Sequence, residues 1–222
     1  MSAVSASCPN CGATIVFRWA QAVQTTCQYC QSILVRHDLV LERVGESAIV
    51  PLTPSPLQIG TEGVWRDAPF TVIGRLVYAW ERGGWSEWHL RLENDASAWL
   101  SDAQAEYVVT ASVTPDEALP SPDRVRPGTQ ITQRAVRYEV TTVTRARYIG
   151  TEGELPFTTW GRDVATFADL RSVADGVAAP SGGFRSTFAT IDYTEEPALL
   201  YTGEAVELSQ LALHNLRTFE GW

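Results

Sequence analysis

Four cysteines are the residues whose spacing points most directly to chemistry in this chain. They form the pattern C-x2-C-x15-C-x2-C, at Cys8, Cys11, Cys27 and Cys30. Each C-x2-C turn can direct two thiolates at one ion, and four thiolates complete the tetrahedral shell of a structural zinc site with no open position for a substrate. Two disulfides or a redox-active pair are the alternatives, but cytosolic proteins disfavour disulfides, and a redox pair needs no matching second pair. The spacing therefore predicts one structural zinc ion and leaves no cysteine as a nucleophile.

A second group of candidate residues consists of charged side chains that interrupt apolar, strand-like segments. These residues are Glu154, Asp169, Arg171 and Asp192. Buried carboxylates must be paired or hydrogen-bonded, so we expect these residues to form a polar network. The network is either structural and anchored by Arg171, or it lines a pocket for a cationic ligand or for catalysis.

Other routes to catalysis find little support. The three histidines, His37, His89 and His214, are far apart in the sequence, and a lone histidine on a strand is more often structural than catalytic. The chain has no lysine, which excludes Schiff-base chemistry and a P-loop lysine. No fingerprint of a serine hydrolase, zinc protease or dinucleotide-binding fold is present. We therefore predict no catalytic residue and favour a role other than that of an enzyme.

The charge distribution argues against nucleic-acid binding. The net charge is −9. Residues 1–44 hold three arginines against two acids, whereas the remainder holds 14 arginines against 24 acids. An acidic body opposes binding to phosphate backbones. No apolar run reaches the roughly 18 to 20 residues of a membrane-spanning helix, and no signal-like segment precedes Cys8, so we expect a cytoplasmic protein without a transmembrane segment.

The elements that position these groups are predicted to be strands. Residues 57–100 hold five of the eight tryptophans, and residues 70–80 and 87–92 alternate between apolar and polar types, as in a β-hairpin. If all large apolar residues share one face, the register pairs Trp80 with Trp88 across a three-residue loop. Trp85 then lies at the exposed tip beside Arg82, and these two residues form a candidate surface for a protein partner.

The expected fold class is mainly β, with a zinc ribbon followed by two small antiparallel β units that are barrel- or sandwich-like. The predicted domains are residues 1–50, the ribbon and following strands, residues 57–113, a tryptophan-rich unit, and residues 128–222, a second unit. Pro51, Pro54 and Pro56 suggest a stiff linker after the ribbon. An offset of 68 residues relates Gly60 to Gly128, Phe70 to Tyr138, Val72 to Val140, Trp80 to Tyr148 and Trp99 to Phe167. A pseudo-duplication of the β unit is therefore predicted.

Several short segments carry a resemblance to a known family. They read LQIGTEG, FTVIGR, WSEWHL and AWLS, preceded by CPNCG, CQYC and VRHDL and followed by GELPF, FADLRS, FATIDY and YTGE. This pattern resembles a bacterial family of uncharacterised proteins, DUF4178, in its version with an N-terminal zinc ribbon. The resemblance implies no activity. It does imply a setting close to phage-shock-type membrane-remodelling proteins and to polyamine aminopropyltransferases.

Three function classes remain open. The favoured one is a non-catalytic adaptor or scaffold whose ribbon and exposed aromatic residues bind a protein partner, in a membrane-stress-linked system. The alternative is a ligand-binding protein or enzyme that uses the acidic second unit for a polyamine-type cation. The third is a nucleic-acid-binding zinc ribbon, which the acidic charge disfavours.

Overall fold

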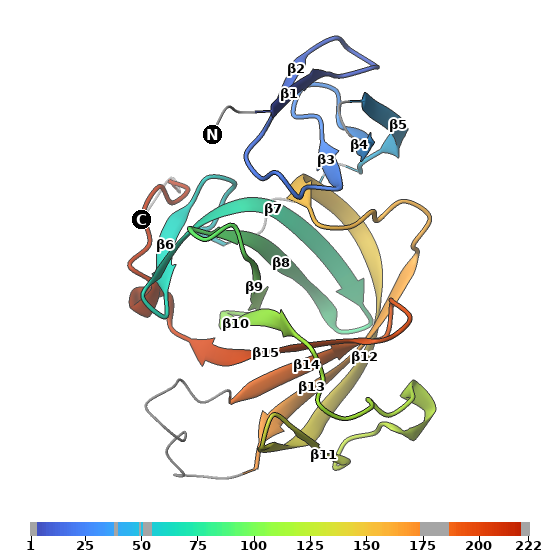
Figure 1. The fold of residues 1–222 in the computed structure, drawn as a ribbon, viewed down its shortest axis with the longest axis vertical. Coiled ribbons are helices and arrows are strands. Elements are labelled where there is room, and N and C mark those ends of the chain that lie inside the picture. Colours follow the sequence, from blue (N-terminus) through green and yellow to red (C-terminus); the bar gives the residue numbers. More distant parts are fainter. Residues whose placement is uncertain (1–3, 38–39, 49, 51–54, 174–186, 219–222) are drawn as a thin grey trace.

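The computed structural model describes residues 4–218 apart from 38–39, 49, 51–54 and 174–186. Eight strands close into an antiparallel barrel, in the order β7-β8-β9-β10-β15-β14-β13-β12, because β12 pairs back onto β7 (Figure 1). The mainly β class is thereby confirmed, and strands of both predicted units share one barrel. The barrel strands are β7 (Ala68–Trp80), β8 (Gly83–Leu92), β9 (Ser97–Ala103), β10 (Glu106–Val113), β12 (Val136–Leu155), β13 (Val164–Ser172), β14 (Phe188–Asp192) and β15 (Leu199–Val206).

The cysteine ribbon packs against one end of the barrel. Its strands are β1 (Val4–Ser7), β2 (Thr14–Phe17), β3 (Gln24–Thr26), β4 (Ser32–His37) and β5 (Val40–Glu46). Strand β3 pairs with the end of β12, and Ile73 of the barrel belongs to the ribbon's hydrophobic core. The ribbon is therefore continuous with the barrel sheet. Pro51 and Pro54 of the expected linker lie outside the described residues.

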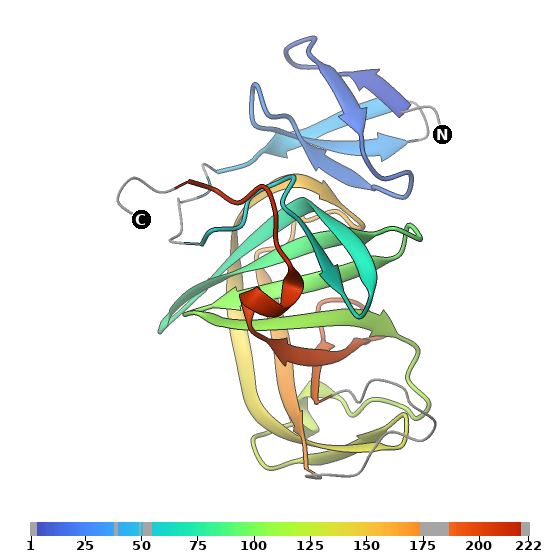
Figure 2. The same ribbon diagram turned by 90° about the vertical axis from the view of Figure 1, so that its left-hand side faces the viewer.

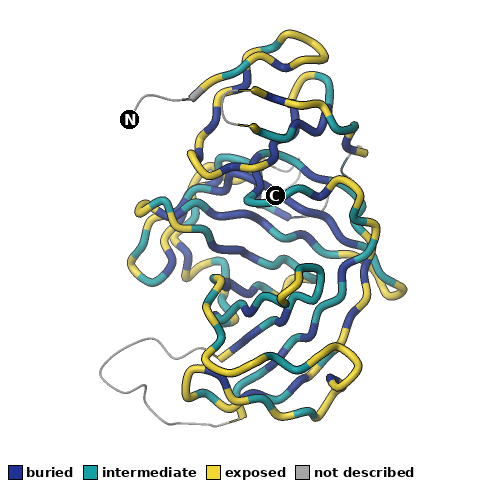
Figure 3. Tube along the Cα trace, turned by 45° about the vertical axis from the view of Figure 1, so that its right-hand side comes forward, coloured by how far each residue is buried: buried dark blue, intermediate teal, exposed yellow. Residues whose placement is uncertain are grey.

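Both faces of the barrel sheet are buried. The outer face of β7–β10 packs under β6 (Glu62–Trp65) and the 3₁₀ helix η3 (Leu208–Leu211), which lie side by side in Figure 2. The outer face of β12–β15 packs under β11 (Gln130–Gln133) and residues 113–125, which include the short 3₁₀ helix η1 (Pro122–Arg124). Many residues along the barrel strands are consequently buried or half-buried rather than exposed, as Figure 3 shows.

The predicted hairpin register is wrong. Trp80 pairs with Gly83 across the two-residue turn Glu81–Arg82, and Tyr78 rather than Trp80 faces a tryptophan, Trp85. A bulge after Val72 switches the parity of β7, so that Phe70 and Val72 pack outside the barrel whereas Leu76 and Tyr78, also at even positions, pack inside. The prediction assumed one buried face, and that assumption fails when the interior and the exterior of a barrel are both covered.

The two halves of the barrel repeat the same backbone arrangement. β6 pairs with β7 through Glu62 and Thr71, and 68 residues later β11 pairs with β12 through Gln130 and Glu139. The bulge after Val72 likewise recurs after Val140. Trp99 does not follow the predicted offset, because the strand register matches it to Thr190 rather than to Phe167. A duplication of the sequence itself stays a prediction.

We predict that Trp88 and Trp80 contribute independently to stability. Trp88 is fully buried in the outer core and faces Arg75, whereas Trp80 is half-buried on the opposite side of the sheet. Trp88→Ala should lower the free energy of unfolding by roughly 3 to 5 kcal/mol, and Trp80→Ala should cost about 1 kcal/mol. Urea denaturation of the double variant should give the sum within about 0.5 kcal/mol. Strong coupling between the two substitutions would contradict this register.

Candidate metal centre and ligand cavity

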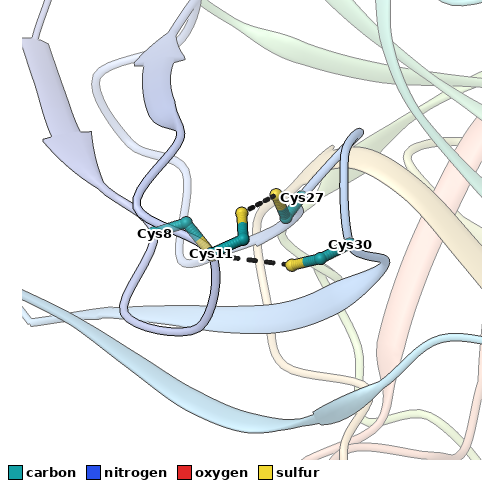
Figure 4. A group of neighbouring side chains, drawn as sticks. All are labelled: Cys8, Cys11, Cys27 and Cys30. Atoms are coloured by element: carbon teal, nitrogen blue, oxygen red, sulfur yellow. Dashed lines mark hydrogen bonds between the residues drawn. The ribbon is translucent and has the colours of Figure 1, made fainter.

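The four cysteines come together at the base of two knuckle turns (Figure 4). Cys8 Sγ lies 3.7 Å from Cys30 Sγ, and Cys11 Sγ lies 3.8 Å from Cys27 Sγ. In each turn the first cysteine's carbonyl accepts a hydrogen bond from an N–H four residues later, of Gly12 or Gln31, whose φ angles of 75° and 58° close the turn. A Zn–S distance of about 2.3 Å implies tetrahedral S···S edges of roughly 3.8 Å. The arrangement therefore fits four thiolate ligands around one metal ion.

Glu154 lies away from the other predicted acids and joins the ribbon to the barrel. Its Oε1 accepts the N–H of Arg18 at 2.8 Å, and its Oε2 accepts the N–H of Trp19 at 2.9 Å. Burial raises the pKa of Glu154, while these two N–H groups act in the opposite direction. Its role is structural: a carboxylate of the barrel strand anchors the ribbon loop.

The histidines are also placed outside any catalytic arrangement. His89 is fully buried between the rings of Trp19 and Trp99, whose centroids lie 5.0 and 4.8 Å away. Its Nδ1–H donates to the carbonyl of Glu154, and its Nε2 accepts from Ser97 Oγ, both at 2.8 Å. Burial lowers the pKa of His89 to about 4, so the ring is neutral near pH 7. His37 lies beside Glu42 on the ribbon surface. The backbone of His214 forms an isolated β-bridge with the backbone of Glu62.

The barrel encloses a cavity of about 340 Å³. Every barrel strand contributes to its lining, because alternate residues of each strand point inward. Rings dominate the wall, namely those of Tyr78, Trp80, Trp85, Trp99, Phe157, Phe167, Phe188 and Tyr201. The polar remainder includes four acids, Glu87, Glu106, Asp169 and Asp192, and a single basic residue, Arg171. The cavity is therefore both aromatic and acidic.

Three of the four residues of the predicted polar network thus line one cavity. Thr190 Oγ1 donates to Asp169 Oδ1 at 2.9 Å, and the N–H of Thr194 donates to Asp192 Oδ1 at 2.8 Å. The guanidinium of Arg171 lies 4.8 Å from the centroid of the Phe188 ring. Arg171 favours the charged form of Asp169 electrostatically, but it makes no ion pair with that residue within the described part of the chain.

Glu87 is a buried acid of the cavity that the sequence pattern did not single out. Ser101 Oγ lies 2.7 Å from both carboxylate oxygens and donates to them, and Trp85 Nε1–H donates to Oε1 at 2.8 Å. Burial, reinforced by the negative charges of Asp169 and Asp192, raises the pKa of Glu87 to about 7. Burial likewise raises the pKa of Asp169 and of Asp192. Glu87 and Trp88 are neighbours on β8 and therefore point to opposite faces. An inward-facing Glu87 could have been predicted if both faces of this strand had been known to be covered.

Trp85 is not at an exposed hairpin tip. Its ring stacks on Tyr78 inside the barrel, with centroids 4.9 Å apart. Arg82 does lie exposed on the turn, with its guanidinium 5.8 Å from the centroid of the Trp80 ring. The surface predicted to bind a protein partner therefore lacks its main aromatic residue. An interaction through Arg82 stays a prediction.

Fold and site together define a cavity-containing β-barrel that carries a four-cysteine ribbon. The chain belongs to the family described as a domain of unknown function, DUF4178, whose model matches residues 58–179. This match covers the first half of the barrel and continues through β13. No curated protein and no solved structure matches the chain. Among the described residues, no helix is long and apolar enough to span a membrane.

We predict that Glu87 makes the stability of the ligand-free protein depend on pH. Because its folded-state pKa is raised from 4.5 to about 7, the folded protein holds a proton that the unfolded chain releases, and stability falls as pH rises through this window. Glu87→Gln should therefore raise the free energy of unfolding above pH 7, by up to about 3 kcal/mol, and should have little effect at pH 4. Chemical denaturation across this range measures the effect. Glu81→Gln, on the exposed turn, serves as the control, and identical pH profiles for wild type and Glu87→Gln would contradict the assignment.

We predict about one metal ion per chain in protein purified under reducing conditions without chelator. Elemental analysis should find it, and Cys27→Ser should lose it, because Cys27 is a buried member of the cluster. A metal-free protein with four titratable thiols would count against the site. Circular dichroism of the variant shows whether its barrel remains folded.

Proposed function

We propose that this protein binds a small organic cation inside the barrel, and that the metal held by its ribbon is a structural zinc ion. The observation that carries the proposal is a barrel cavity whose wall combines aromatic rings with more acids than bases. Aromatic faces attract ammonium and guanidinium groups, and the attraction grows when water is excluded. Carboxylates in the same space supply the complementary charge.

The electrostatics of the cavity support a cation over a neutral or anionic ligand. Glu87, Asp169 and Asp192 all have raised pKa values because burial penalises their charged forms. A bound cation would offset this penalty, since an opposite charge nearby favours the ionised carboxylate. An anion would increase the penalty, and a neutral ligand would supply no charge to offset it.

The adaptor role favoured by the sequence stays a prediction, as do phage-shock-type partners. Its main sequence argument was an exposed Trp85, and this side chain packs inside the barrel and donates to Glu87. Binding of an organic cation agrees with the alternative stated from the sequence, although the lining draws on both halves of the barrel rather than on residues 128–222 alone.

A matched pair of probes tests the charge preference. Isothermal titration at pH 8 and low salt should detect benzylammonium binding, with at least tenfold weaker binding of benzyl alcohol, which has a similar shape and no charge. Asp169→Asn should weaken benzylammonium binding about tenfold, or about 1.4 kcal/mol, and should leave benzyl alcohol unaffected. The amide can still accept the hydrogen bond of Thr190, so folding should be retained.

Asp163→Asn is the control, since it removes the same charge from an exposed residue outside the cavity lining. Equal affinity for both probes, or an equal effect of the two aspartate substitutions, would contradict the proposal. Binding should also strengthen between pH 6 and pH 8, because Glu87, whose pKa is about 7, becomes ionised over this range.

A further inference from the structure

A second hollow lies where the ribbon meets the barrel. It has a volume of about 670 Å³, and its walls are residues 94–97 of the β8–β9 turn, residues 195–197 of the β14–β15 turn, and Trp19 and Gln21 of the ribbon. Three rings line both this hollow and the barrel cavity, namely Trp99, Phe157 and Tyr201. The two spaces therefore meet at these rings.

The opposite end of the barrel cavity differs in its surroundings. There the lining includes the exposed residues Gly84, Gln104, Glu106 and Thr141, which lie at strand turns or at the bulge of β12. Exposed residues also border the hollow on the ribbon side, among them Gln21, Asn94 and Glu196, so the two ends differ in that the ribbon lies over one of them.

The covering loop of the ribbon is held by several contacts to the barrel. Glu154 accepts the N–H groups of Arg18 and Trp19, and Trp19 Nε1–H donates to the carbonyl of Asp95 at 2.9 Å. Arg91 also donates to the carbonyl of Arg18. A carboxylate that accepts two backbone N–H groups fixes the loop as well as its own side chain.

The same loop is packed onto the cysteine cluster. Trp19 is 3% exposed, and it belongs to one hydrophobic cluster with Cys8 and Cys27. Small cysteine ribbons depend on their metal for folding, because the binding free energy of the ion offsets the cost of ordering the chain. The position of Trp19 therefore depends on the metal centre on one side and on Glu154 on the other.

From this arrangement we infer that the metal-bound ribbon is a plug that narrows one end of the barrel cavity. Filling of the cysteine site holds Trp19 beside the constriction of Trp99, Phe157 and Tyr201 and so restricts access to the cavity from this end. Loss of the metal releases the plug and widens this route to the cavity. Occupancy of the metal site thereby controls access to the barrel interior, whichever ligand the barrel holds.

The test measures exposure of individual tryptophans in the full chain, without any ligand. Protein labelled with fluorotryptophan is examined by fluorine NMR, with resonances assigned by single Trp→Phe variants and broadened by a neutral, soluble nitroxide. Three residues report on separate places: Trp19 on the ribbon, Trp99 on the constriction, and Trp88 on the outer core of the barrel. Removing the metal with a chelator and a reductant should increase the broadening of Trp19 and Trp99 several-fold and leave Trp88 unchanged.

Glu154→Gln tests the same plug with the metal in place. It removes one of two carboxylate acceptors, and should increase broadening at Trp99 while the metal content stays at that of the wild type. Glu152→Gln is the matched control, because this neighbouring glutamate pairs with Arg75 instead of the ribbon loop.

Three results would overturn the inference. Exposure of Trp19 with Trp99 still protected would mean that the ribbon does not cover the constriction. Exposure of Trp88 together with Trp99 would mean that the metal supports the whole barrel rather than a plug. No change at Trp19 after metal removal would mean that the ribbon stays docked without the ion.

Discussion

Pairing along strand β12 is the constraint on which the rest of the structure depends. Its 20 residues pair successively with β13, with β7 and, at Glu154 and Leu155, with β3 of the ribbon. A register shift after Val140 interrupts its pairing with β13, and another after Tyr148 interrupts its pairing with β7. Gly74 permits a close approach of β7 and β12, since a Cβ there would lie 2.1 Å from the carbonyl oxygen of Glu154. The pairing with β7 closes the barrel, so that each of its eight strands has a neighbour on both sides, and the last two residues bring the ribbon onto its end.

How far the sequence predicts this structure depends on the range of the interactions involved. The cysteine cluster depends on spacing within two short turns, so local pattern was sufficient to find it. Asp169 and Asp192 were recognisable as polar residues in apolar strands, and the cavity explains their position. The hairpin register and the inward position of Glu87 were not recognisable, because alternation shows that a strand has two faces but not that both are covered. Glu154 was grouped with the wrong residues, because its partners, Arg18 and Trp19, are more than 130 positions away.

The buried acids of the cavity reduce the stability of the barrel when no cation is bound. Burial raises the pKa of Glu87, Asp169 and Asp192, which means that their charged forms are disfavoured in the folded state. The fold tolerates them because its largest apolar clusters lie outside the barrel wall, under β6 and η3 and under β11. Burial on the outer faces stabilises the strands, so the inner face is free to carry groups that do not stabilise it.

The two halves of the barrel share one strand arrangement but place different side chains at an equivalent position. By strand register, the pair His89 and Trp99 of the first half corresponds to the pair Asp169 and Thr190 of the second. In the first half the two rings stack at 4.8 Å, and His89 lies against Trp19 beneath the ribbon. In the second half Thr190 donates to the Asp169 carboxylate, and both residues line the cavity. Rings at this position fill the end of the barrel that receives the ribbon, whereas small polar groups at the equivalent position leave space and add charge. The difference between the halves thus places a filled end beside the metal centre and an acidic wall in the interior.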